Sequence, residues 1–392
     1  MGLHTPFVSL GIDAWTGKPY HLCSKKSLLS FGIVILLILA MASERLMFKA
    51  MVDRMQSYRY FLCQLMTFLY IPPLFCIVGY KSTQDEFIEE EVTEFPKYHF
   101  FVMGILDLLY AMMLFIAGGN TEPMQTLLLM QASIPLTACL SAVFYRTSYS
   151  RVQLLGNFVM AAGLVVAFLP SLNDFNSDNF EDREVAWNTL VYLLAAVPGA
   201  LSMLYKERAI RDQPMDMIYL NAWVTVYQFI VGLMVAPVVF DADVLHLEQK
   251  MSGLECLING KNEVETDHCE LGIAILLIFI FSNVLINFLL LQVLRLTSVS
   301  VMNVTTILGF VASFVVLAWY ELDPDDFGVR ILRNWFSSTT LVLDFIAFVA
   351  IVVGKILYQW EPDPDTEATT RSAEDKEAQS LLNELDYGYR YT

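Results

Sequence analysis

The chain has 392 residues, of which 56% are hydrophobic and 17% are charged, and its formal net charge is −17. A soluble protein of this length carries about 25% charged residues, so the composition excludes an ordinary soluble domain. Acidic residues gather at 85–94 and after Glu361, in segments expected to be solvated. No basic surface typical of nucleic-acid binding is indicated.

Apolar blocks of about 20 residues recur along the chain, and a helix of that length crosses a bilayer. Backbone polar groups cannot remain unpaired in lipid, so each block must be helical. We therefore predict an all-α polytopic membrane protein with ten transmembrane helices. The predicted spans are approximately 29–49, 59–80, 98–118, 124–145, 152–172, 187–208, 217–239, 272–294, 298–319 and 339–360.

The segments outside the spans are assigned to two sides of the membrane. An even number of spans places both termini on one side, and Lys and Arg near span ends are more numerous there, which indicates the cytosol. Residues 1–28 are expected to be a cytosolic segment without a removable signal peptide. The connector at about 240–271 is then lumenal, and the tail 361–392 is predicted to be disordered in the cytosol.

The lumenal connector contains two cysteines, Cys256 and Cys269. Two cysteines in a non-cytosolic loop either form a disulfide or remain free thiols, and we favour the disulfide. Apolar residues recur at helical spacing around Cys256, which predicts a short amphipathic helix on the lumenal face. They are Val244, Leu247, Met251, Leu254 and Ile258.

Ten helices suggest a duplication of five. Shifting the sequence by 176 residues superimposes the third and fourth spans on the eighth and ninth, and pairs Asp107 with Asn283. Because five is odd, the second copy must be inverted relative to the first. We predict inverted repeats at about 29–172 and 187–360, an arrangement that permits alternating access to a site near the midplane.

The same shift pairs Ser133 with Gly309. Next to Ser133, Pro135 cannot donate a helical hydrogen bond, and Gly309 is expected to loosen the ninth span at a similar depth. A carbonyl freed in this way persists only against protein or a water-filled cavity. The pattern indicates a substrate cavity, or else the ordinary frequency of Pro and Gly in membrane helices.

Asp107 is the main candidate for substrate or ion coupling. A carboxylate at the bilayer centre costs about 2.5–3.5 kcal/mol, and burial disfavours its charged form, so it is suited to take up a proton. The alternative is a structural acid bonded to a neighbouring helix. Gln131, Ser133 and Asn283 are polar groups that contact a ligand or join helices.

Glu44 and Arg45 lie near the predicted lumenal end of the first span. They either filter substrate charge at the mouth of the cavity or extend their charged groups to the membrane surface.

The tail contains an acidic dileucine pattern, formed by Glu377, Leu381 and Leu382. Such a signal binds sorting adaptors and directs a protein to lysosomal or vacuolar membranes, although a short pattern also arises by chance.

Five short segments carry a family resemblance. They are 43–49 (SERLMFK), 58–64 (YRYFLCQ), 106–108 (LDL), 130–136 (MQASIPL) and 144–146 (FYR). In order and spacing the chain resembles the chloroquine-resistance-transporter-like (CRT-like) family over about 29–360. The resemblance implies the drug/metabolite transporter fold, with ten helices in two inverted repeats and cytosolic termini.

The resemblance also implies a function. Members are similar to proton-driven exporters of peptides, amino acids and cationic drugs from acidic vacuoles, and plant relatives to plastid carriers of glutathione and related thiols. Arg45 then occupies the position of a basic residue whose loss admits cationic drugs, and Asp107 that of the family's acid. Asn283 stands where parasite members have a second acid, and the loop has cysteines for one disulfide rather than two.

We predict a secondary active transporter of peptides, amino acids or thiols such as glutathione, coupled to protons, in a vacuolar or endolysosomal membrane, with a plastid as the alternative. One rival is a carrier of nucleotide sugars or organic phosphates, which would need a pair of basic residues deep in the cavity. Another is a non-transporting receptor or scaffold. No enzyme, metal or cofactor motif is recognisable, and we expect a monomer or weak dimer.

Overall fold

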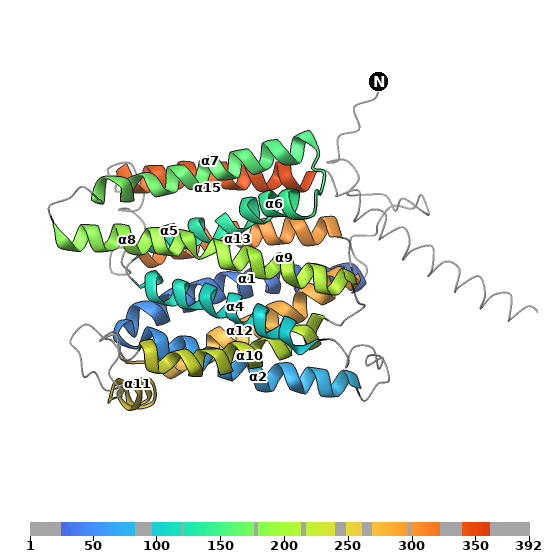
Figure 1. Ribbon diagram of the computed structural model, residues 1–392. Helices are drawn as coiled ribbons and strands as arrows, with labels where there is room; N and C mark the ends of the chain where they lie inside the picture. Colours follow the sequence, from blue (N-terminus) through green and yellow to red (C-terminus); the bar gives the residue numbers. More distant parts are fainter. Residues whose placement is uncertain are drawn as a thin grey trace, which may run out of the picture.

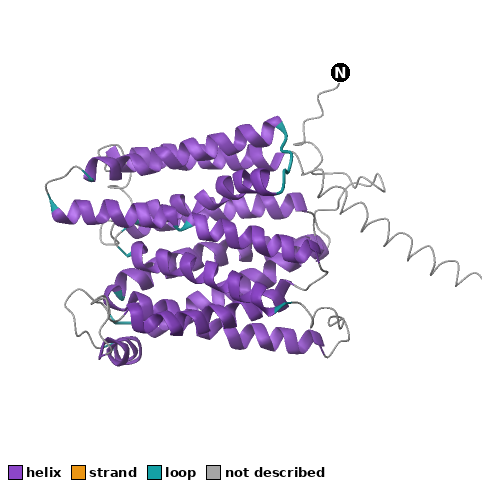
Figure 2. Cartoon of the chain, viewed as in Figure 1, coloured by secondary structure: helices purple, strands orange, loops and turns teal. Residues whose placement is uncertain are grey.

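The computed structural model describes residues 25–82, 96–119, 121–175, 179–212, 217–239, 248–260, 269–296, 299–321 and 339–360. Every regular element in these ranges is helical (Figure 2). The first 24 residues, the acidic connector at 83–95 and the tail from 361 lie outside the described residues. The predicted sorting signal at Glu377, Leu381 and Leu382 is therefore not described.

Ten helices in the described ranges are long and apolar enough to cross a membrane, which confirms the predicted number. They are built from α1 (Lys25–Arg54), α2 (Arg59–Ser82), α4 (Lys97–Gly118), α5 with α6 (Pro123–Leu129 and Ser133–Phe144), α7 (Arg151–Asp174), α8 with α9 (Phe180–Leu194 and Ala196–Asp212), α10 (Met217–Val239), α12 (Gly272–Leu296), α13 (Val299–Glu321) and α15 (Thr339–Trp360). Short helices η2 (Gln56–Tyr58), η3 (Met130–Ala132) and α11 (Glu248–Asn259) complete the described elements.

The spanning helices run side by side across the view in Figure 1, and α11 is seen end-on at one end of the bundle. This orientation agrees with a helix that lies along the membrane surface. Of the apolar residues predicted for this helix, α11 includes Leu254 and Ile258, whose side chains are exposed. Val244 and Leu247 lie outside the described residues.

The helix contacts follow the proposed duplication. The first span (α1) packs against the eighth and ninth (α12 and α13), and the sixth (α8 and α9) packs against the third and fourth (α4 and α6). A five-plus-five duplication relates these two sets of contacts, because each span corresponds to the one five places later. The contacts agree with a duplication of five spans, and the inversion of the second copy stays a prediction.

The fifth and tenth spans, α7 and α15, approach each other closely at two glycines. A Cβ atom on Gly156 would lie 2.6 Å from the backbone nitrogen of Tyr358, and one on Gly354 would lie 2.8 Å from the carbonyl oxygen of Gly156. Small residues allow two membrane helices to pack in this way where larger side chains would separate them.

Candidate substrate cavity

A cavity of about 790 Å³ lies among α4, α6, α9, α10, α12 and α15. Its inner part is lined by Asp107 and Asn283, each about halfway along its helix. Its outer part is lined by Thr147 and Tyr149, between α6 and α7, and by Tyr358 near the end of α15. The cavity therefore extends from the middle of the bundle toward the end at which α6 and α15 finish (Figure 1).

Asp107 is held by two side chains from α9. Its Oδ1 accepts a hydrogen bond from the Ser202 hydroxyl at 2.5 Å, and its Oδ2 lies 2.6 Å from the Lys206 ammonium nitrogen. Ser202 and Lys206 are four residues apart, so both project from one face of α9 toward α4. Asp107 and Lys206 both line the cavity, and their side chains are about one-fifth exposed (20% and 18%).

The facing wall comes from the interrupted fourth span. The α-helix stops at Leu129, a 3₁₀ turn covers Met130–Ala132, and a second α-helix begins at Ser133, which precedes the predicted break at Pro135. Ser133 lines the cavity and its hydroxyl donates to the Met130 carbonyl at 3.1 Å. Pro135 itself is buried behind this wall, and its carbonyl accepts a 3.4 Å hydrogen bond from Asn157.

The opposite end of the bundle is held together by charged side chains. The Lys49 ammonium, which is 3% exposed, donates to the carbonyls of Gly118 at 2.9 Å and Thr121 at 2.7 Å, and pairs with Asp53 at 2.5 Å. Gly118 is the last residue of α4 and Thr121 follows it, and carbonyls at the end of a helix have no backbone donor within that helix. Asp53 also accepts a 3.4 Å hydrogen bond from the Tyr320 hydroxyl. Together these contacts, the Lys49 network, tie α1 to the ends of α4 and α13.

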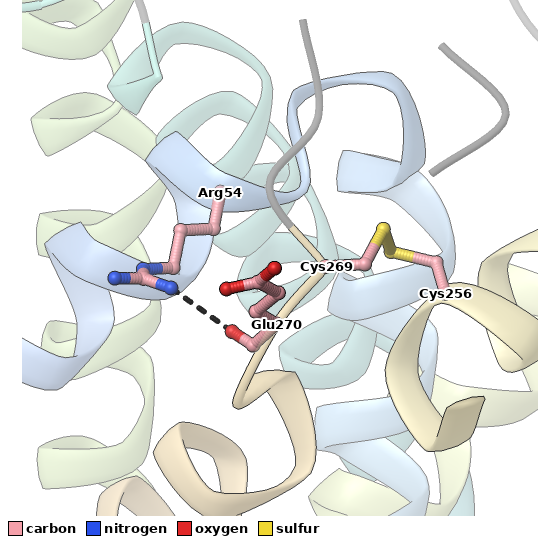
Figure 3. The surroundings of a disulfide bond; sticks show 4 residues. All are labelled: Arg54, Cys256, Cys269 and Glu270. Carbon is pink, nitrogen blue, oxygen red and sulfur yellow. Dashed lines mark hydrogen bonds between the residues drawn. A yellow bond between two sulfur atoms is a disulfide. The ribbon is translucent and has the colours of Figure 1, made fainter. Parts of the chain in front are cut away.

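A disulfide joins Cys256 in α11 to Cys269, just before α12, with an S–S distance of 2.01 Å. Beside it, the Arg54 guanidinium donates a 2.9 Å hydrogen bond to the Glu270 carbonyl (Figure 3). The loop that carries the disulfide is thus bound to the end of α1, next to the Lys49 network.

The described cavity opens at the opposite end of the bundle from the end of α1 near which Glu44 and Arg45 lie, so their role as a charge filter at a lumenal mouth stays a prediction. The helix α1 continues to Arg54, so Arg45 lies about 13 Å from its end. The Arg45 guanidinium lies 3.1 Å from the Glu44 carboxylate and 3.1 Å from the Met130 sulfur. Neither Glu44 nor Arg45 lines the described cavity.

Two other predicted residues have structural roles. Gly309 lies in the unbroken helix α13, so the expectation that it loosens the ninth span is wrong. A Cβ there would lie 2.6 Å from the Met41 sulfur, and Gly309 instead allows α1 to approach α13. The Gln131 amide donates to the Leu127 carbonyl at 3.2 Å and does not line the cavity.

The structure thus brings Asp107, Ser133 and Asn283 together around one cavity, and adds Lys206, which the sequence analysis did not single out. Among the described residues, no group of three His, Cys, Asp or Glu side chains could hold a metal ion.

The family model described as "CRT-like, chloroquine-resistance transporter-like" matches residues 30–358. The chain belongs to the CRT-like family. This CRT-like protein is 28% identical to Crt homolog 1 of Dictyostelium discoideum over 328 residues, which cover 75% of this chain and 68% of that one. It is 23% identical over 334 residues to Protein CLT1, chloroplastic, of Arabidopsis thaliana, with coverage of 82% and 71%.

It is also 34% identical to the chloroquine resistance transporter of Toxoplasma gondii over 202 residues, which cover 52% of this chain and 22% of the relative. The match with Crt homolog 3 of Dictyostelium discoideum likewise spans only 44% of that protein. The family membership and the ten spans make the chain a multi-pass membrane transporter, not an enzyme.

Proposed function

We propose that this CRT-like transporter carries small peptides, amino acids or thiols across a vacuolar or endolysosomal membrane, with Asp107 in the substrate site and protons as the coupling ion. The observation that carries the proposal is the cavity, which reaches an acidic side chain in the middle of the bundle. Toward the other end, the Lys49 network holds α1, α4 and α13 together. A central site open toward one face is one state of an alternating-access cycle.

The charges in the cavity favour this cargo over organic phosphates. The charged residues on its described lining are Asp107, Glu207 and Lys206, and the one basic residue is already paired with Asp107. A phosphate or a nucleotide sugar would need positive charge in excess. A receptor or scaffold would not need a carboxylate in a cavity at this depth, where it is costly to insert.

The disulfide supports an orientation. Disulfides persist in oxidising compartments and are rare in the cytosol, so the end of the bundle with α11 and the Lys49 network is proposed to face the lumen. The cavity then faces the cytosol. The name of CLT1 refers to the chloroplast, which keeps a plastid membrane as the alternative location.

Uptake by the purified full-length protein in liposomes tests the proposal. Labelled leucine, a dipeptide and glutathione are offered with and without an imposed pH gradient. We expect a pH gradient to accelerate uptake of at least one solute, and Asp107→Asn to reduce that uptake at least about tenfold. Asp182→Asn, the same change at the start of α8 and away from the cavity, serves as the control. Undiminished gradient-driven uptake by Asp107→Asn would remove Asp107 from the mechanism.

A further inference from the structure

The ion pair between Asp107 and Lys206 defines a more specific site within the cavity. We propose that these two residues together bind a ligand that carries an ammonium group and a carboxylate group on the same carbon, the head group of a free α-amino acid. The inference deepens the proposed function and rests on it. It adds Lys206 as the residue that selects the carboxylate, while Asp107 selects the ammonium group.

Both charges are accessible from the cavity. Asp107 and Lys206 are on its lining and each keeps about one-fifth of its side chain exposed, so a solute that enters can reach both. Ser202 fixes the second carboxylate oxygen of Asp107 at 2.5 Å and does not itself line the described cavity. The Asp107 carboxylate is therefore held in orientation from behind, while its other oxygen meets Lys206.

The energetics favour a ligand with two opposite charges. Separating Asp107 from Lys206 leaves two charges unpaired in a partly buried site, which is strongly unfavourable. A zwitterion replaces the single ion pair by two, one with each residue. A ligand with only an ammonium or only a carboxylate group satisfies one residue and leaves the other charge unpaired, so it is expected to bind more weakly.

The distance between the Asp107 oxygen and the Lys206 nitrogen determines which zwitterions can bind both residues. Because the Lys206 nitrogen lies 2.6 Å from the Asp107 oxygen, the two charges of the ligand must be close together, as they are on one carbon. The charged ends of an ordinary dipeptide are separated by a peptide unit. The rest of the cavity has room for a side chain, with Ser133, Thr137 and Met203 on its walls. Glu207, a further acid on the lining, disfavours a second carboxylate nearby.

Exchange of the ion pair also links binding to movement. Asp107 is on the third span and Lys206 is on the sixth, so the pair joins the two predicted repeats. A ligand that pairs with both Asp107 and Lys206 replaces their direct ion pair, so the two spans are then connected through the ligand.

Three matched ligands test the inference in liposomes that contain the full-length protein. Leucine has both charges, leucinamide has only the ammonium group, and N-acetylleucine has only the carboxylate. We expect leucine to inhibit uptake of labelled leucine at concentrations at least about tenfold lower than either analogue. Equal inhibition by leucinamide or N-acetylleucine would overturn the inference.

Failure of the two proposals is distinguishable. Uptake of a dipeptide or glutathione that leucine does not inhibit overturns the amino-acid site but leaves the transporter function intact. No uptake of any offered solute overturns the proposed function, and the amino-acid site with it.

Variants separate recognition from a structural role of the pair. In Asp107→Asn the unpaired Lys206 should shift the preference toward N-acetylleucine, and in Lys206→Met the unpaired Asp107 should shift it toward leucinamide. The exchange Asp107→Lys with Lys206→Asp should regain a preference for leucine. A purely structural pair predicts that the single variants lose all three ligands in the same proportion, and that result would contradict the inference.

Discussion

Lys49 is a charged residue that the membrane-spanning bundle uses for structure. Its ammonium group is buried and donates to the carbonyls of Gly118 and Thr121, at and just after the end of α4, as well as to the Asp53 carboxylate. Without the Lys49 ammonium, the buried ends of these contacts would lose a hydrogen-bond donor, and Asp53 would keep only its hydrogen bond from Tyr320.

Lys49→Met should therefore destabilise the protein by about 3–5 kcal/mol, the usual loss when one member of a buried ion pair is removed. The apparent melting temperature of the purified protein in detergent measures this effect. Lys97→Met, the same change at the exposed start of α4, should lie within about 0.5 kcal/mol of the wild type. Equal melting temperatures for the two variants would contradict the structural role of Lys49.

At this scale the sequence reveals single residues better than pairs. Asp107 could be recognised because one acid within an apolar span is conspicuous by itself. Its partner Lys206 could not, because it lies six residues before the end of its helix and looks like an interfacial lysine. The pairing depends on how α4 and α9 pack, which local sequence does not specify.

The fourth span shows how an element shapes the cavity. Its change to a 3₁₀ turn at Met130–Ala132, just before Pro135, divides the span where Ser133 reaches the lining. The sequence predicted this break because proline has a direct backbone effect. It did not predict the continuous helix at Gly309, because glycine permits a bend without requiring one and here serves helix packing instead.

Pro135→Ala should restore the missing backbone donor and make the span more regular. Pro135 lies in the first turn of α6, where a proline is tolerated, so the variant should be about as stable as the wild type in thermal unfolding. Its uptake rate should fall, because the wall that carries Ser133 changes shape. Pro170→Ala, within α7 and away from the described lining, is the control. Unchanged uptake by Pro135→Ala would show that the break has no role in transport.

The disulfide connects α11 to the start of α12 at the proposed lumenal end of the bundle. Replacing Cys256 and Cys269 by serine should lower stability by about 2–4 kcal/mol, since the bridge restricts a short loop in the unfolded chain. Reductant should lower the melting temperature of the wild type and leave that of the double variant unchanged. A wild type that is insensitive to reductant under unfolding conditions would argue against the bridge.

At the scale of the whole molecule, the number of spans follows from hydrophobic length alone, whereas the exact helix ends and the functional state do not. Apolar blocks specify where the chain crosses the membrane. The closed end and the cavity are formed by side chains from distant spans, since Lys49 contacts the end of α4 and Asp107 contacts Lys206. These contacts join segments far apart in the sequence, so the sequence pattern could suggest a cavity but not its open side.

The central claim is that access to the cavity alternates between the two ends of the bundle. Two introduced cysteines report on it. Thr147→Cys lies at the cavity mouth, and Thr121→Cys replaces a buried residue whose carbonyl belongs to the Lys49 network. Both are treated with a membrane-impermeant thiol reagent in sealed vesicles of each orientation, with the wild type as the background for Cys23, Cys63, Cys76 and Cys139. At rest, the account predicts labelling at position 147 from the cytosolic side and protection at position 121. With substrate and an imposed pH gradient, labelling at 147 should fall while labelling at 121 from the lumenal side rises. Labelling that changes in the same direction at both positions, or at neither, would contradict alternating access.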